Sequence, residues 1–208
     1  MKKILCLSIL AVLLASCGPK IYTDTSINNY VQSHHSLAIL PPKVSIPAQK
    51  NVDAAAMLEE QKTESVSFQK EMYSWLLHRK QQGKLRIEIQ DVDVTIAKLN
   101  KIGYYDGDFG ASMTPDELAQ ALGVDAVLSS NYTLSKPMST GAAIAVAVLL
   151  GAWGSTAKTV VNLNLYDGKT GKMIWNYNHR ASGTFTSPND LVTSLMNNAS
   201  KKLPYIQK

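Results

Sequence analysis

Residues Val161–Tyr177 read VNLNLYDGKTGKMIWNY, and this stretch constrains the fold more than any other part of the chain. Apolar and polar side chains alternate in its first half, which is typical of a strand with one buried face. The turn residues Asp167-Gly168-Lys169-Thr170-Gly171 follow. The pattern predicts a β-hairpin whose return strand places Met173, Trp175 and Tyr177 on one face. We expect Trp175 to lie in the core or in an interface.

Helices and strands alternate along the rest of the chain. Thr114-Pro115-Asp116-Glu117 is a capping signal for a helix that Gly123 ends, and Ser187-Pro188-Asn189-Asp190 begins the last helix in the same way. Hydrophobic periodicity predicts strands at 37–40, 85–90 and 124–134, and further helices at 54–82 and 92–99. These elements predict an α/β fold: a single sandwich of helices on a mixed sheet, with a C-terminal β-hairpin and a final helix.

The first twenty residues, MKKILCLSILAVLLASCGPK, indicate export. Lys2 and Lys3 precede an apolar run that is too short to span a bilayer as a helix. The run ends in Leu14-Ala15-Ser16-Cys17, which is similar to a bacterial lipobox. In a lipobox the cysteine thiol receives diacylglycerol, cleavage occurs before the cysteine, and the new amino terminus is acylated, here expected with palmitate. We expect residues 1–16 to be the signal peptide and Cys17 to carry the lipid. The alternative is an ordinary secretory peptide with a coincidental cysteine.

The part that remains after cleavage suits one domain of ordinary size. Gly18 to Ser36 is polar and lacks sustained periodicity, so we expect 17–36 to be an extended lipidated tether and 37–208 to be the α/β domain. The domain has no cysteine of its own, because Cys6 leaves with the signal peptide. The formal charge of +5 is modest, and a protein outside the cytoplasm does not meet nucleic acid, so we expect no nucleic-acid partner.

Residue types that support catalysis are not grouped in the sequence. His34 and His35 are adjacent, His78 and His179 are isolated, and none has metal-ligand spacing with another histidine or a carboxylate. The chain has no Gly-x-Ser-x-Gly motif and no phosphate-binding loop. We expect no catalytic residue, no metal ion and no cofactor, and therefore a protein that is not an enzyme.

Residues Gly141–Trp153 form an apolar segment without charge. As a helix it would reach only about 20 Å, which is less than the bilayer needs, whereas a strand of about 9–11 residues would cross. Three explanations stay open: packing on its own sheet, self-association, or membrane insertion. The candidate interaction residues are Ile144, Val146, Val148, Leu149, Leu150 and Trp153.

The lipobox, the strand LAILPP at 37–42, LAQALGVDAVLSSNYTL at 118–134 and the hairpin together resemble a known family. This is the group of outer-membrane lipoproteins with a CsgG-like fold, which includes the curli secretion lipoprotein CsgG, the exopolysaccharide lipoprotein PelC and the amino-terminal domain of TolB. The turns Gly123–Ala126 and Asp167–Gly171 carry most of the resemblance. It implies a periplasmic scaffold that often assembles in rings and has no catalytic residues.

We therefore expect a lipoprotein of the outer membrane, anchored through Cys17 and facing the periplasm. Gly18 follows the cysteine in place of the aspartate that commonly retains lipoproteins in the inner membrane. The expected function is that of a non-catalytic scaffold or accessory in envelope assembly or secretion, acting through contacts with envelope proteins and through self-assembly. Two alternatives remain: a regulator of a cell-wall enzyme or ligand-binding module, and a subunit of a secretion pore.

Overall fold

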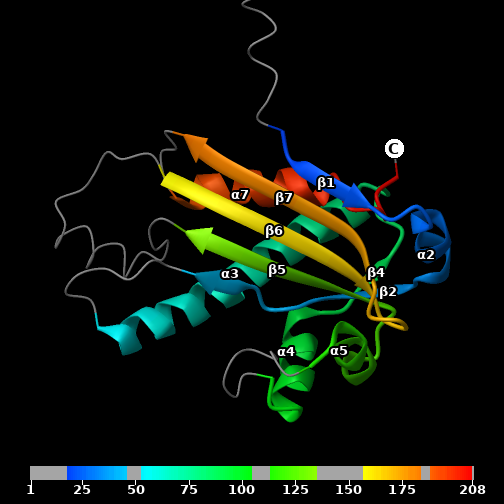
Figure 1. Cartoon of the computed structure of the whole chain (residues 1–208), viewed down its shortest axis with the longest axis horizontal. Coiled ribbons are helices and arrows are strands. Elements are labelled where there is room, and N and C mark those ends of the chain that lie inside the picture. Colours follow the sequence, from blue (N-terminus) through cyan, green and yellow to red (C-terminus); the bar gives the residue numbers. More distant parts are fainter. Residues whose placement is uncertain (1–17, 46–52, 105–112, 135–156, 184–187, 208) are drawn as a thin grey trace, which may run out of the picture.

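One mixed sheet organises the chain in the computed structural model, which describes residues 18–45, 53–104, 113–134, 157–183 and 188–207 (Figure 1). Within these ranges there are five helices and seven strands, and the predicted α/β class is confirmed. The elements, in chain order, are β1 (Lys20–Thr23), α2 (Ile27–Ser33), β2 (Ser36–Ile39), β3 (Lys43–Ser45), α3 (Ala54–Gln81), β4 (Glu88–Ile89), α4 (Val92–Lys101), α5 (Pro115–Leu122), β5 (Ala126–Leu134), β6 (Ala157–Asp167), β7 (Met173–Gly183) and α7 (Pro188–Ser200).

The strands lie in the order β1-β7-β6-β5-β2-β4, and β3 pairs with β5 beyond the end of β2. β5, β6 and β7 are antiparallel neighbours, and the predicted hairpin joins β6 to β7. β1 is antiparallel to β7. β2, β3 and β4 run parallel to the strands with which they pair. The sheet is therefore antiparallel at the β1 edge and parallel at the β4 edge.

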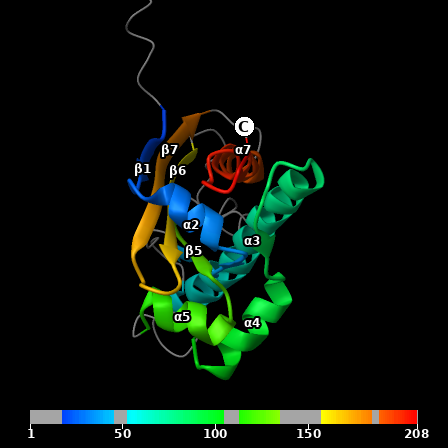
Figure 2. The same cartoon turned by 90° about the vertical axis from the view of Figure 1, so that its right-hand side faces the viewer.

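The two faces of the sheet carry separate cores because successive strand residues point to opposite sides. Leu37 and Ile39 belong to the larger cluster, which packs against α3 and α7, whereas Ala38 and Leu40 belong to a smaller cluster under α4 and α5. Figure 2 shows the sheet edge-on, with α7, α2 and α3 on one side. On the other side, none of the described elements covers β1, β7 and β6 away from α5. We call this uncovered surface, together with the exposed residues Asn131 of β5 and Lys43 of β3 that continue it across the sheet, the open face.

The predicted helix boundaries agree closely with the structure. Asp53 caps α3 by accepting a hydrogen bond from the Ala56 amide, and Gly83 follows this helix with a φ of +69°. At α5 the Thr114 amide donates to Glu117 Oε2 at 2.8 Å, which is half of the predicted capping box. Gly123 ends α5 at a φ of +66°, where a residue without a Cβ is favoured.

The hairpin is confirmed, but Met173 lies on the face opposite to the one predicted. Leu165 pairs with Trp175, whereas the next residue, Tyr166, pairs with Met173, so Ile174 is an extra residue in β7. Such a β-bulge reverses the alternation of side chains beyond it. Trp175 is 1% exposed, as predicted, while Met173 is 37% exposed.

The predicted extended tether is wrong for most of its length. Lys20–Thr23 pair with Asn178–Trp175 of β7, and α2 follows. Ile27, Tyr30 and Val31 of α2 pack against the larger core. Their spacing is a helical periodicity, but it covers less than two turns in an otherwise polar stretch, which is why the stretch resembles a linker. Residues 20–33 therefore belong to the folded domain.

Candidate functional site: the N-terminal clasp

The segment from Thr23 to Ser36 is fastened to one end of the sheet by polar side chains. We call this set the clasp; its members are Asp24, His34, Asp125, Asp167, Lys172 and Tyr205. They come from the N-terminal segment, from the turn between α5 and β5, from the β6–β7 turn and from the chain end after α7. The clasp therefore joins four parts of the chain that are far apart in sequence.

The two turns that carry the family resemblance meet at the clasp. The Gly168 amide donates to the Asp125 carbonyl oxygen at 2.8 Å. A Cβ on Gly168 would lie 2.7 Å from Ala119 Cβ and 2.8 Å from the same carbonyl oxygen, so a larger residue would force the turns apart. Gly171 has a φ of +67°, which completes the turn. Gly168 therefore allows the two turns to pack closely, in addition to its place in the β6–β7 turn.

His34 is the centre of the clasp. It is 8% exposed, and both of its ring nitrogens have partners. Nε2 donates to Asp167 Oδ1 at 2.9 Å, because an ionised carboxylate only accepts. Nδ1 lies 2.6 Å from the Tyr205 hydroxyl oxygen, which is able to donate or to accept. Burial raises the pKa of Tyr205, with a further contribution from Asp167 and Asp125, so it stays a neutral phenol.

Asp167 links His34 to the hairpin turn. Its Oδ2 accepts from the Thr170 amide at 2.8 Å and from the Thr170 hydroxyl. Burial alone raises the pKa of the Asp167 carboxyl, but the hydrogen bonds from Thr170 and His34 outweigh burial and hold this pKa below its ordinary value. The group is thus a buried anion that is hydrogen-bonded on both oxygens.

Asp125 plays the same part for the start of β2. Its Oδ2 accepts from the amides of His35 and Ser36 at 2.8 and 2.9 Å, and from the Ser36 hydroxyl at 2.9 Å. Burial raises the pKa of the Asp125 carboxyl. The hydrogen bonds lower this pKa by more than burial raises it, so the net pKa is below the ordinary value. A single carboxylate thus satisfies two backbone donors at the start of β2.

Asp24 and Lys172 close the other side of the clasp. Lys172 Nζ lies 2.7 Å from Asp24 Oδ2, and Asp24 Oδ1 accepts from the Ser26 amide at 2.8 Å. The hydrogen bond from Lys172 is the main cause that lowers the Asp24 pKa, followed by the Ser26 amide. The Asp24 amide also donates to the Ile174 carbonyl at 2.9 Å, where the β-bulge lies.

This arrangement fastens the N-terminal segment to the sheet and occupies both ring nitrogens of His34. A general base needs a basic atom, most often a histidine nitrogen or a carboxylate oxygen, within reach of a substrate proton. His34 is buried and both nitrogens are hydrogen-bonded within the protein, while the Ser36 hydroxyl is directed to Asp125. In the described part of the chain, no group of three or more His, Cys, Asp or Glu side chains is placed to hold a metal ion.

Cys17 and the candidate interaction residues Ile144, Val146, Val148, Leu149, Leu150 and Trp153 lie outside the described residues. Among the helices that are described, none is both long enough and apolar enough to span a membrane. From the sequence pattern, His34 is expected in a tether and Asp167 only in a turn. The helical spacing of Ile27, Tyr30 and Val31 was the signal that this segment folds back.

Comparison with known proteins yields weak similarities in structure. No protein-family model and no curated protein matches the chain. A solved structure of a PelC dodecamer from Paraburkholderia phytofirmans is 9% identical, with a TM-score of 0.48 over 92% of this chain and 99% of that chain. Lipoprotein GNA1162 from Neisseria meningitidis is 15% identical, with a TM-score of 0.42 over 81% of this chain and 97% of that one. The LpoB C-terminal domain from Salmonella enterica is 11% identical, with a TM-score of 0.36 over 76% and 93%. At these values the likeness says nothing about function.

Proposed function

We propose that the protein is a non-catalytic lipoprotein of the outer membrane, facing the periplasm, whose lipid at Cys17 holds the α/β domain directly against the bilayer. In this role it acts as a scaffold or accessory that contacts other envelope proteins. The observation that carries the proposal is the position of β1, because its first residue, Lys20, is only three residues after Cys17.

The short connection limits how far the domain stands from the membrane. Three residues span at most about 10 Å when fully extended. Lys20 is paired with Asn178 in the sheet, and the clasp fixes the segment that follows β1. A lipidated Cys17 would therefore place the N-terminal end of β1 near the headgroups, whereas a tether of twenty residues would leave the domain free to move away.

The apolar segment Gly141–Trp153 belongs to the same proposal. The chain leaves β5 at Leu134 and enters β6 at Ala157, and these strand ends lie at the end of the sheet where β1 begins. We infer that Ile144, Val146, Val148, Leu149, Leu150 and Trp153 contact the membrane or a second copy of the chain close to the lipid anchor.

Fractionation of cells that express Cys17→Ala tests the anchor. The variant should stay in the soluble fraction or persist as a precursor with its signal peptide. Cys6→Ala is the matched control, because Cys6 leaves with the signal peptide, and it should fractionate as wild type does. Equal recovery of Cys17→Ala and wild type in the outer membrane would contradict the proposal.

Replacement of residues 142–152 by a short Gly/Ser linker tests the apolar segment. We expect the far-ultraviolet circular dichroism of the folded domain to be retained, because hairpin loops commonly need only about 2–5 residues. Oligomer size or binding to lipid vesicles should fall, since exposed apolar patches mark interaction surfaces. Loss of the fold, with association unchanged before melting, would instead show that the segment is part of the core.

A further inference from the structure

The open face carries a row of amide side chains. We define the amide row as Asn131, Asn162, Asn164, Asn176 and Asn178, from β5, β6 and β7. Asn131 pairs with Asn162, which pairs with Asn178, so these three side chains lie on one face across three strands. Asn164 and Asn176 pair with each other two residues along the same strands. All five are exposed or half-buried.

The amide row is organised by its own hydrogen bonds. Asn176 Nδ2 donates to Asn162 Oδ1 at 2.5 Å, to Asn164 Oδ1 at 2.6 Å and to the Leu163 carbonyl at 3.2 Å. The side-chain oxygens of Asn162 and Asn164 thus accept from Asn176, and their NH₂ groups are left as donors. Among the described residues, neither NH₂ group has a protein acceptor. A carboxamide offers both donors and an acceptor, which is what a set of sugar hydroxyls requires.

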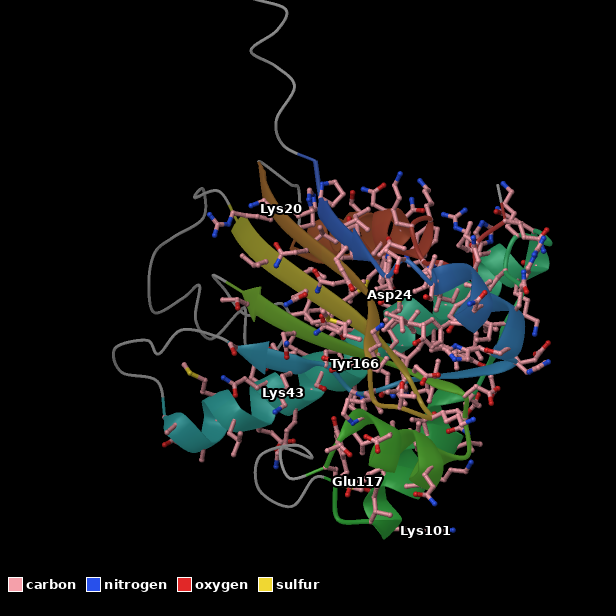
Figure 3. The ribbon with its side chains drawn as sticks, turned by 45° about the vertical axis from the view of Figure 1, so that its right-hand side comes forward. Lys20, Asp24, Lys43, Lys101, Glu117 and Tyr166 are labelled. Atoms are coloured by element: carbon pink, nitrogen blue, oxygen red, sulfur yellow. The ribbon has the colours of Figure 1, made fainter. Side chains whose placement is uncertain are left out.

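Positive side chains flank the amide row on both sides. Lys20 of β1 pairs with Asn178, and Lys43 of β3 pairs with Asn131, so both lysines belong to the same line across the sheet. Figure 3 shows Lys20 and Lys43 on either side of β7, β6 and β5. Four strand spacings of about 4.8 Å put their backbones about 19 Å apart. Arg180 is exposed two residues beyond Asn178 on β7. None of the described strand residues on this face is Asp or Glu.

We propose that the open face binds an anionic glycan chain, with the amide row holding hydroxyl groups and Lys20, Lys43 and Arg180 holding carboxylates or other acidic groups. The line from Lys20 to Lys43 is long enough for several sugar rings. Tyr22, which is 47% exposed and pairs with Asn176, supplies an aromatic ring beside the row. A protein partner is less well matched, because interface hot spots are buried aromatic and apolar anchors, whereas this face is mostly amide.

The experiment measures binding of oligogalacturonate, an anionic glycan, to the lipidated full-length protein in detergent by titration calorimetry. A malto-oligosaccharide of equal length is the neutral probe. Lys20→Gln with Lys43→Gln should weaken oligogalacturonate binding by about tenfold, because hydrogen bonds to charged groups are the stronger ones. Lys70→Gln with Lys101→Gln removes the same charge from α3 and α4 and should leave binding unchanged. Figure 3 shows Lys101 at the end of α4, away from Lys20 and Lys43.

A second pair of variants tests the amides. Asn131→Ala with Asn178→Ala spares the hydrogen bonds of Asn176 and should also weaken binding by about tenfold. Asn29→Ala with Asn100→Ala, at exposed positions on α2 and α4, is the matched control. Solubilised peptidoglycan strands and lipopolysaccharide core oligosaccharide then distinguish two sources of the same chemistry. Binding of either one supports the proposal.

Three results would overturn the proposal. The first is no oligogalacturonate binding, or equal binding of the malto-oligosaccharide. The second is dissociation of a homo-oligomer by the open-face variants without any glycan binding, which would assign the face to a second copy of the chain. The third is binding that appears only after residues 142–152 are replaced, which would assign the face to the chain's own segment. Cys17→Ala fractionation does not depend on this face, so the two proposals fail separately.

Discussion

The clasp and the open face are both polar, but their side chains have different partners. In the clasp, Asp167 and His34 are buried and satisfy each other. On the open face, Asn131 and Lys20 are exposed. Polar groups that are buried with partners hold a fold together, whereas exposed polar groups on a sheet are available to a ligand. The difference suggests a stability role for the first region and a binding role for the second.

Of these variants, Trp175→Ala should cause the largest loss in the free energy of unfolding, because it removes a core side chain. The indole is 1% exposed in the larger core, so its loss should lower the free energy of unfolding by about 3–5 kcal/mol. Met173→Ala, two residues away but turned outward by the β-bulge, should change it by no more than about 0.5 kcal/mol. Denaturant unfolding measures both. Equal effects would show that the bulge is absent and that the simple alternation is correct.

His34→Ala tests the clasp. Its loss leaves the Asp167 carboxylate and the Tyr205 hydroxyl buried without their partner, so the unfolding free energy should fall by about 1–3 kcal/mol. Hydrogen exchange of α2 should rise at the same time. His35→Ala is the control, because this neighbouring side chain is exposed and it is the His35 amide that binds Asp125. A stable His34→Ala variant with protected α2 would contradict the role given to the clasp.

Acid should weaken the clasp before it affects the open face. Asp24, Asp125 and Asp167 have lower pKa values in the folded chain than the ordinary value, so the unfolded chain binds more protons as the pH falls. Their stabilisation is complete above the ordinary aspartate pKa of about 3.9 and is lost below it. Unfolding measured from neutral pH to about pH 3 should show this loss, and Asp125→Asn should reduce its slope. A loss already complete at about pH 6 would assign it to another group.

Asn131→Ala should have the smallest effect on stability. The side chain is exposed on the open face, so the unfolding free energy should change by no more than about 0.5 kcal/mol. Thermal unfolding of this variant beside His34→Ala compares the two regions directly. A cost as large as that of His34→Ala would mean that the amide row also supports the fold.

Sequence periodicity was sufficient for α3, α4, α5, α7, the hairpin and the α/β class, because local spacing and caps determine these features. It missed α2, whose apolar periodicity covers less than two turns. It was insufficient where contacts between distant residues decide the structure. Asp167 and His34 are 133 residues apart, and no local pattern indicates that they meet. The bulge at Ile174 adds one residue without any glycine or proline to mark it, so the face of Met173 could not be foreseen. The amide row was visible only as alternation, and its continuation to Lys20 and Lys43 depends on strand order.

Energy transfer to a headgroup dye tests most directly whether the domain is held against the membrane. In the lipidated protein, Cys17 is modified, so Ile21→Cys provides one reactive thiol on β1, where Ile21 is 43% exposed. A fluorophore there, in protein reconstituted into vesicles, should transfer strongly to the dye, and one at Lys101→Cys on α4 should transfer weakly. A flexible Gly/Ser linker inserted between Gly18 and Pro19 should abolish the difference. Equal transfer from the two positions without the linker, or strong transfer that survives the linker, would contradict the short, fixed connection.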